Sequence, residues 1–425
     1  MPWTARLLFA SIRLKKRRAD WVETMINYAP LSERLNTPIS SAELERRWTA
    51  IRAAMTDQKI DVLLTQANND FVGGYVKYLT DLPGSNGYPF TVVFPRDDRM
   101  SVIGQGPFDQ DVILPEAGDG IRRGVHRVLG TPSYASVHFT STYDAECALK
   151  ALSGYEGATI GLLGPGAISW STVDHLKRHM PRANFVDASP LVDEIKAVKS
   201  PEEIGLIRRM AALQDAAAQA VTKALRPGLR DADMVQIARQ ASTTFASEQG
   251  WYMAASGPVG TAAVMQPPHQ QHRTIQAGDQ FCMLIENNGP GGYYGEIGRT
   301  WVLGKASQEM KDEFAFVLEA QRFTLDMMTP GADPAEIHAR YNAFMREHKR
   351  PEEHRLYAHG QGYDMVERPI IRQDETMKLG PNMLFAVHPT YVTKTTYSWV
   401  CDNWLINAQG KIEALHKFPQ VITEL

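Results

Sequence analysis

Residues 286–300 have the sequence ENNGPGGYYGEIGRT and place Glu286 and Glu296 ten positions apart across a glycine-rich turn. An apolar run, FCMLI at 281–285, leads into the turn, and this pattern predicts a β-hairpin or a bulged pair of strands. Because side chains alternate between the faces of a strand, an even spacing points both carboxylates to the same side unless a bulge shifts the register. Such carboxylates are metal ligands, acid/base groups or part of a solvated face.

The length and composition predict a globular protein of two domains. A chain of 425 residues is too long for one ordinary core, and its 44% hydrophobic and 22% charged residues are typical of globular proteins. A net charge of −3 argues against a nucleic-acid partner. The three cysteines are scattered and form no disulfide pattern, which predicts a reducing, cytoplasmic location.

The first twenty residues contain a short apolar run followed by a basic cluster, RLKKRR at 13–18. A secretory signal has the opposite order, so we expect a basic amphipathic helix lying on a partner subunit, with membrane-surface binding as the alternative. The sequence has no run of about eighteen apolar residues, which predicts that no segment spans a membrane.

Between residues 40 and 190, helical and strand-like segments alternate, which predicts an α/β domain. Residues 41–59 have apolar side chains at helical spacing after Ser40, and short buried strands are expected at 61–65, 90–94, 101–104 and 159–163. A second region begins at Ser200, a candidate N-cap followed by Pro201 and acidic residues, and its helix is expected to end near Leu225. The domain boundary is expected between Asp187 and Ser200.

Six motifs from residue 194 onward occur in the order found in one protein family. They are EIKAVKSPEEIGLIRRMA (194–211), AGDQF (277–281), GGYYGEIGRT (291–300), AHGQGYDMVERP (358–369), LGPNMLFAVHP (379–389) and CDNWLINAQGKIEALHKFP (401–419). In this the chain resembles the pita-bread family, which includes methionine aminopeptidase, Xaa-Pro aminopeptidase, prolidase, creatinase and related dimethylsulfoniopropionate lyases. The resemblance implies a basic extension (1–40), an α/β N-terminal domain like that of creatinase and prolidase (41–193) and an α+β pita-bread catalytic domain (194–425).

The resemblance also indicates where metal ligands are expected. Metal-dependent relatives use two hairpin aspartates, a histidine in HGxG, a glutamate before a proline and a last glutamate before an aspartate. Here Glu296 takes the second aspartate's place and Glu286 most nearly the first's, one residue closer than the family spacing. His359 matches the histidine, whereas His388 and Cys401 stand where the two glutamates are expected.

These departures argue against a centre of two hard cations, because imidazole cannot bridge two ions without losing a second proton. One iron or zinc ion and no metal remain equal alternatives, since creatinase-like relatives use histidine and glutamate as acid and base without metal. Strand alternation predicts that Cys401 faces inward, and Asp402 is the other candidate at that strand. The predicted catalytic residues are Glu286, Glu296, His359 and His388, and the predicted metal ligands are these four and Asp402.

The substrate side of the site departs from the peptidases too. They have a histidine seven residues after the HGxG histidine, where this chain has Val366, and prolidases have an arginine where Trp399 stands. These changes predict a repurposed enzyme. A structural interpretation stays open for each residue that we expect to contact substrate: a solvated loop for the histidines, a surface salt bridge for Glu367 and core packing for the aromatic residues. The residues expected to contact a small-molecule substrate are His269, His272, Tyr294, Glu367 and Trp399.

The leading hypothesis is an enzyme that hydrolyses a C–N bond of a small nitrogen-containing metabolite in the manner of creatinase. Three alternatives remain open: a metal-dependent lyase resembling dimethylsulfoniopropionate lyase, an Xaa-Pro dipeptidase or aminopeptidase, and a non-catalytic binding protein that keeps the cleft. Relatives with this N-terminal domain are commonly homodimers, so the resemblance implies a homodimer here.

Overall fold

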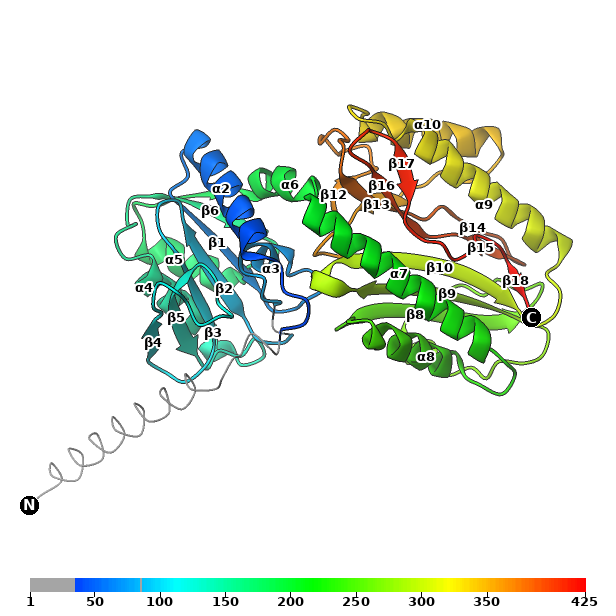
Figure 1. The fold of residues 1–425 in the computed structure, drawn as a ribbon, viewed down its shortest axis with the longest axis horizontal. Helices are drawn as coiled ribbons and strands as arrows, with labels where there is room; N and C mark the ends of the chain where they lie inside the picture. The colour runs from blue at the N-terminus through cyan, green and yellow to red at the C-terminus, as the bar shows by residue number, and fades with distance from the viewer. Residues whose placement is uncertain (1–34, 85) are drawn as a thin grey trace, which may run out of the picture.

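The computed structural model describes residues 35–84 and 86–425, which form two layered units side by side (Figure 1). The basic segment at 13–18, with its expected amphipathic helix, lies outside the described residues.

The first unit is a mixed seven-stranded sheet of order β4-β5-β3-β2-β1-β6-β7 with helices on both faces (Figure 1). β1 pairs antiparallel with β2 and parallel with β6, and its alternating side chains join two apolar clusters, Leu63 on one face and Leu64 on the other. The predicted α/β class and strands are therefore confirmed. The strands are β1 (Val62–Ala67), β2 (Phe90–Pro95), β3 (Met100–Gln105), β4 (Gln110–Ile113), β5 (Val125–Thr131), β6 (Thr159–Leu163) and β7 (Asn184–Asp187). The helices are α2 (Ser41–Asp57), α3 (Gly74–Thr80), α4 (Tyr143–Ala151), α5 (Trp170–His179) and α6 (Ser189–Ala197), with a 3-10 turn at His138–Thr140.

The second unit contains a sheet of order β18-β10-β9-β8, a sheet of order β12-β11-β13-β16-β17 and the hairpin β14-β15. Its strands are β8 (Gly250–Pro258), β9 (Asp279–Asn288), β10 (Tyr294–Val302), β11 (Ala358–Gly360), β12 (Glu367–Ile370), β13 (Met383–Val387), β14 (Thr390–Val392), β15 (Tyr397–Trp399), β16 (Asp402–Ile406), β17 (Ile412–Ala414) and β18 (Thr423–Glu424). Its helices are α7 (Pro201–Ala224), α8 (Asp231–Thr244), α9 (Gln308–Met327) and α10 (Pro334–Glu347), with 3-10 turns at Pro268–Gln270 and Pro290–Gly292.

Helix α7 begins as the sequence predicts. The Ser200 hydroxyl accepts a hydrogen bond from the Glu203 N–H, and the Glu203 carboxylate accepts one from the Ser200 N–H, which completes a capping box with Pro201 in the first turn. The helix then runs across the sheet of β8, β9 and β10 (Figure 1). Gly295 permits this contact, because a Cβ there would lie 1.9 Å from the Met210 sulfur.

The expected hairpin is β9 paired with β10, and no bulge interrupts its register. Gly291 and Gly292 take positive φ angles of 75° and 85° in the connection, a conformation that favours glycine. One face of the hairpin, with Ile285 and Ile297, packs into the apolar core beneath α7 and α8. The carboxylates therefore lie on the opposite face, as the even spacing predicts.

Buried ion pairs join the two units. The side chain of Arg47 on α2 is fully buried, lies 2.9 Å from the Glu203 carboxylate and donates hydrogen bonds to the hydroxyls of Tyr293 and Tyr363. Helix α6 contacts both β6 and β12. The domain boundary expected between residues 193 and 194 falls within α6, and it stays a prediction.

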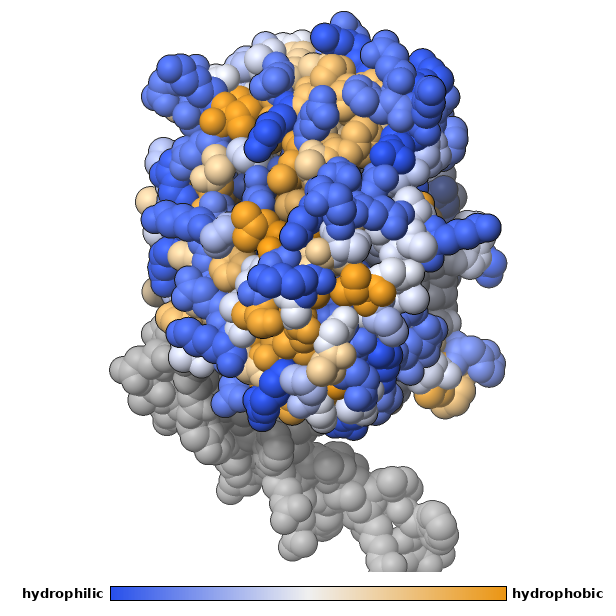
Figure 2. Space-filling view, turned by 90° about the vertical axis from the view of Figure 1, so that its right-hand side faces the viewer, coloured by the Kyte–Doolittle hydropathy of each residue, from blue (hydrophilic) through white to orange (hydrophobic). Residues whose placement is uncertain are grey.

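Seen from the end that carries β18 and the C-terminus, the surface is mostly hydrophilic, with apolar residues gathered in a broken band (Figure 2). Among the residues described here, no helix has the length and apolarity needed to cross a membrane.

We expect Arg47→Met to lower the free energy of unfolding by about 3–5 kcal/mol, because it removes the buried cation of the Glu203 carboxylate and leaves only the longer contact to Arg46. Urea unfolding followed by circular dichroism measures the loss. The matched control is Arg46→Met, which removes a side chain that is 41% exposed and that, like Arg47, contacts Glu43 and Glu203, so its cost should stay within about 1 kcal/mol. Equal losses in the two variants would contradict the assignment.

Candidate active site

The two hairpin glutamates lie directly opposite each other, with Glu286 on β9 paired to Glu296 on β10. Their side chains are almost completely buried, with 7% and 4% of each residue exposed. Burial and, next, the charge of Glu296 raise the pKa of Glu286 well above its ordinary value. Burial opposes ionisation of Glu296 too, but the imidazoles of His359 and His388 outweigh it and hold its pKa at about 2. The two shifts are opposite in direction, so Glu296 ionises more readily than Glu286.

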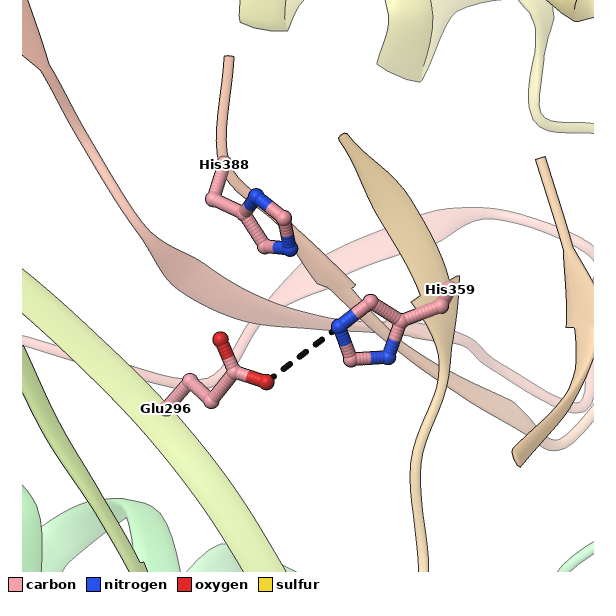
Figure 3. Close-up of side chains that lie close together, drawn as sticks. All are labelled: Glu296, His359 and His388. Atoms are coloured by element: carbon pink, nitrogen blue, oxygen red, sulfur yellow. Dashed lines mark ion pairs between the residues drawn. The ribbon is translucent and has the colours of Figure 1, made fainter. Parts of the chain in front are cut away.

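The second sheet brings two histidines to Glu296 (Figure 3). His359 lies on β11 and His388 directly follows β13, the strand paired with β11, and their ring centroids are 5.2 Å apart. The His359 Nε2 atom lies 3.3 Å from Glu296 Oε1. Burial lowers the pKa of His388 to about 4, so its imidazole is neutral at neutral pH.

The protonation of His359 indicates what this cluster can hold. Its Nδ1 lies 2.9 Å from the Gly360 carbonyl oxygen, which can only accept, so Nδ1 carries a proton. In the neutral ring the lone pair of Nε2 then faces the Glu296 carboxylate. Two acceptors at this distance need a cation between them, which is either a second proton on His359 or a metal ion.

The donor set fits one metal ion. One ligand atom each from Glu296, His359 and His388 lie within 4.8 Å of one another. One carboxylate and two imidazoles suit zinc or iron, whereas a pair of hard cations needs more oxygen ligands. Glu286 is adjacent but is not part of this cluster of three.

Cys401 faces the cluster and Asp402 does not. The Cys401 thiol donates to Glu296 Oε2 over 3.3 Å, and its backbone pairs with Gly298 of β10. The Asp402 carboxylate lies on the other side, where it accepts hydrogen bonds from Arg299 over 2.6 Å and Gln420 over 2.7 Å. With its oxygens engaged in this way, Asp402 stabilises the strand rather than reaching the cluster.

The residues expected to contact substrate lie in three different settings. His269 and His272 are exposed on the loop between β8 and β9, and no contact joins them to the cluster among the residues described. Tyr294 is buried on the hairpin, and its hydroxyl donates to the Asp70 carbonyl of the first unit over 3.3 Å. The Trp399 ring covers Gly298, where a Cβ would lie 1.9 Å from it, two residues from Glu296.

Glu367 lies in a buried ion cluster. Its carboxylate lies 3.1 Å from both Lys196 and Lys199 and accepts a hydrogen bond from the Tyr363 N–H over 2.8 Å. Burial alone raises the pKa of Glu367, but the two lysines lower it by more and hold it at about 2. Glu367 thus anchors the loop that follows His359, and it makes neither a surface salt bridge nor a free carboxylate for substrate.

Two residues that the sequence analysis did not single out position Glu296. The Gln361 amide donates to Glu296 Oε1 over 3.0 Å, and the Asn403 side chain accepts from the Glu296 N–H over 2.7 Å. Asn403 also donates to Gln361 over 2.7 Å, so the three residues form a closed ring of hydrogen bonds. Two patterns in the sequence indicate these residues. Asn403 lies two positions after Cys401 and therefore shares its face of the strand, and Gln361 is the variable position of the HGxG motif.

Comparisons with known proteins agree with this architecture. Residues 205–412 match the model of metallopeptidase family M24. An uncharacterized hydrolase/peptidase, y4tL, of Sinorhizobium fredii is 26% identical over 89% of this chain and 96% of its own length. The Xaa-Pro dipeptidase of Pyrococcus furiosus is 24% identical over 59% of this chain and 72% of its own length.

Solved structures share the whole two-unit fold. The X-Pro aminopeptidase of Thermotoga maritima superposes with a TM-score of 0.72 at 19% identity, covering 89% of this chain and 99% of that one. The recombinant prolidase of Thermococcus sibiricus gives 0.73 at 19% identity, with 91% and 100% covered. These matches confirm the resemblance to the M24 metallopeptidase, or pita-bread, family. The expectations of the fold and of a hydrolase acting on a C–N bond are confirmed, since peptide bonds are C–N bonds.

We expect Glu286→Gln to stabilise the metal-free protein more as pH rises. The pKa of Glu286 is raised in the folded state, so its contribution to stability is full below the unfolded value of 4.5 and is lost at higher pH. A glutamine cannot ionise, so the variant should gain on the order of 1–3 kcal/mol near pH 8 and little near pH 5. Urea unfolding with chelator present measures the free energy of unfolding of the wild-type protein and the variant at each pH.

Glu347→Gln, an exposed change on α10, is the control and should show no such dependence on pH. A pH-independent effect of Glu286→Gln would show that Glu286 is not the protonated member of the pair.

Proposed function

We propose that this chain hydrolyses an amide C–N bond in a small, dipeptide-sized substrate with one divalent metal ion. The observation that carries the proposal is the convergence of Glu296, His359 and His388 from separate strands onto one point (Figure 3). The M24 match and the dipeptidases among the relatives support amide hydrolysis ahead of the creatinase-like hypothesis.

Each residue has a distinct task in this proposal. A zinc or iron ion held by Glu296, His359 and His388 would polarise the scissile carbonyl and acidify a water molecule. Burial and the charge of Glu296 raise the pKa of Glu286, which lies beside Glu296, so it serves as the general acid that protonates the leaving nitrogen. Gln361 keeps the Glu296 carboxylate in place.

A metal-free mechanism is the second candidate, and a specific observation favours it. His388 and Cys401 occupy the positions of two glutamates that bind metal in relatives. With a proton in place of the ion, the imidazolium of His359 would pair with Glu296 over the same 3.3 Å. Glu286 keeps the role of acid in either mechanism, so metal content decides between them.

Trp399 stands at the substrate end where relatives have a charged side chain. Prolidases have an arginine at this position, whereas here an indole packs against Gly298 among Leu284, Tyr397 and Cys401. An apolar wall binds a neutral group better than a carboxylate, because a buried carboxylate without a partner costs free energy. We therefore propose a substrate whose leaving part is uncharged at this end. The homodimer and the cytoplasmic location stay predictions.

Glu296→Gln and His359→Ala should each lower kcat/KM by at least about 100-fold, since both remove a group at the reacting centre. Turnover is measured on a panel of Xaa-Pro dipeptides and aminoacyl amides, before and after chelation. Glu347→Gln and His354→Ala, exposed changes of the same kinds, should leave turnover unchanged. Retained activity in both site variants would contradict the proposal, and full activity without metal would favour the metal-free mechanism.

A dipeptide amide should be hydrolysed with a kcat/KM at least about tenfold higher than that of the matching dipeptide with a free carboxylate. This ratio corresponds to a difference of about 1.4 kcal/mol in transition-state stabilisation. Paired substrates that differ only in this group provide the measurement. Trp399→Arg, which restores a cation, should narrow or reverse the preference. A preference of the wild-type protein for the free carboxylate would contradict the apolar wall, whether or not the variant folds.

A further inference from the structure

We propose that Lys196 is a positioning residue for the reaction: it holds the loop at 361–367 in the place from which Gln361 orients the Glu296 carboxylate. This inference rests on the proposed function and deepens it, since it gives a residue of the first unit a part in amide hydrolysis. Lys196 lies on α6, apart from the strands that carry the cluster, and acts only through the loop.

One end of this loop holds Glu296 in place. The amide nitrogen of Gln361 donates both to Glu296 Oε1, over 3.0 Å, and to the Met365 carbonyl oxygen of the loop itself, over 3.1 Å. The amide oxygen of Gln361 accepts a hydrogen bond from Asn403 over 2.7 Å, so the side chain cannot turn over without losing partners. The direction of the Glu296 carboxylate therefore depends on where the backbone of the loop lies.

Lys196 binds the two carboxylates of the same loop. Its ammonium group lies 3.0 Å from the carboxylate of Asp364 and 3.1 Å from that of Glu367. Glu367 Oε1 also accepts hydrogen bonds from the backbone N–H groups of Tyr363, over 2.8 Å, and Asp364, over 3.2 Å. The lysine thus neutralises the very carboxylate that closes the loop into a turn.

The first unit supports this ion pair from a second element, the start of α3. The Gly74 N–H donates to the Asp364 carboxylate over 2.7 Å, and the Lys196 ammonium lies 4.6 Å from the centre of the Tyr75 ring. Burial opposes the charge on Lys196, but the carboxylates of Asp364 and Glu367 outweigh it and raise its pKa well above the ordinary value. The loop is therefore held by a permanent buried cation.

Close packing transmits a shift at the charged end of the loop to Gln361. Gly362, the next residue, has no room for a side chain, because a Cβ there would collide with the Glu367 carboxylate. Its carbonyl oxygen accepts a hydrogen bond from the Tyr294 N–H, the first residue of β10, over 2.7 Å. The backbone beside Gln361 is thus fixed between the Glu367 carboxylate and the strand that carries Glu296.

Loss of the Lys196 cation would disturb this arrangement at its charged end. It removes the ion pair of Asp364 and leaves Glu367 with Lys199. A buried carboxylate without its cation is costly, so the loop would shift to let the charge reach water or another partner. A misplacement of about 1 Å at a reacting centre can lower the rate about 100-fold, so the change would affect catalysis as well as stability.

Lys196→Met should lower kcat at least about tenfold and change KM less than about threefold, because a misplaced carboxylate weakens transition-state binding and leaves the substrate contacts in place. Steady-state kinetics on the panel of dipeptides and aminoacyl amides measure both, with circular dichroism to check folding. Arg350→Met, which breaks a partly buried ion pair with Glu313 away from the loop, should leave kcat unchanged. Asp364→Asn keeps the shape of the carboxylate without its charge and should also lower kcat, which serves if Lys196→Met does not fold.

A double-mutant cycle separates positioning from a general loss of structure. If Lys196 acts through Gln361, Lys196→Met should lower kcat by less than about twofold in the Gln361→Ala protein. Full additivity of the two losses would overturn the inference. A folded Lys196→Met protein with the kcat of the wild type would overturn it as well.

A measurement without substrate distinguishes failure of this inference from failure of the proposed function. In protein grown with isotope-labelled glutamine, the nuclear magnetic resonance signal of the Gln361 side-chain amide is the one that Gln361→Ala lacks. Lys196→Met should shift this signal, whereas Arg350→Met should not, and an unchanged signal in Lys196→Met would overturn the inference. If the signal shifts but the wild-type protein hydrolyses no compound of the panel, the hold of Lys196 on the loop is supported and the proposed function fails.

Discussion

The pairing of β9 with β10 in an unbroken register is the constraint on which the rest of the site depends. It places Glu286 opposite Glu296 and buries Ile285 and Ile297 on the other face, beneath α7 and α8. A slip of one residue in β10 would exchange those faces and drive Glu296 into an apolar core. The register is therefore held by hydrophobic burial, and two neighbouring buried carboxylates that cannot both ionise are its consequence.

The meeting of the two sheets brings further polar side chains to this pair. β10 approaches the second sheet at Gly298, which lacks a side chain and so leaves room for the Trp399 ring and for backbone pairing with Cys401. That contact sets the Cys401 thiol against Glu296, while the ring of Gln361 and Asn403 fixes the carboxylate. Groups from separate strands converge without any of them lying on a flexible loop tip.

Local patterns in the sequence predicted the parts of this arrangement that depend on neighbours along the chain. The alternation around Glu286 and the cap at Ser200 each express a local rule, and both features are present. The partners of Asp402 and Glu367 could not be predicted in this way. Arg299 lies more than one hundred residues from Asp402 in the sequence, and Lys196 lies as far from Glu367, so only tertiary folding joins each pair.

Charge explains why the departures from the family pattern belong together. With His388 and Cys401 in place of two glutamates, the site has fewer carboxylates with which to neutralise two divalent ions. Replacing the prolidase arginine by Trp399 removes a positive charge from the same pocket. Both changes lower the charge that the site offers, to metal ions in one case and to an anionic substrate in the other. Under the proposed function, a single ion and an indole at position 399 would together favour substrates without a free carboxylate.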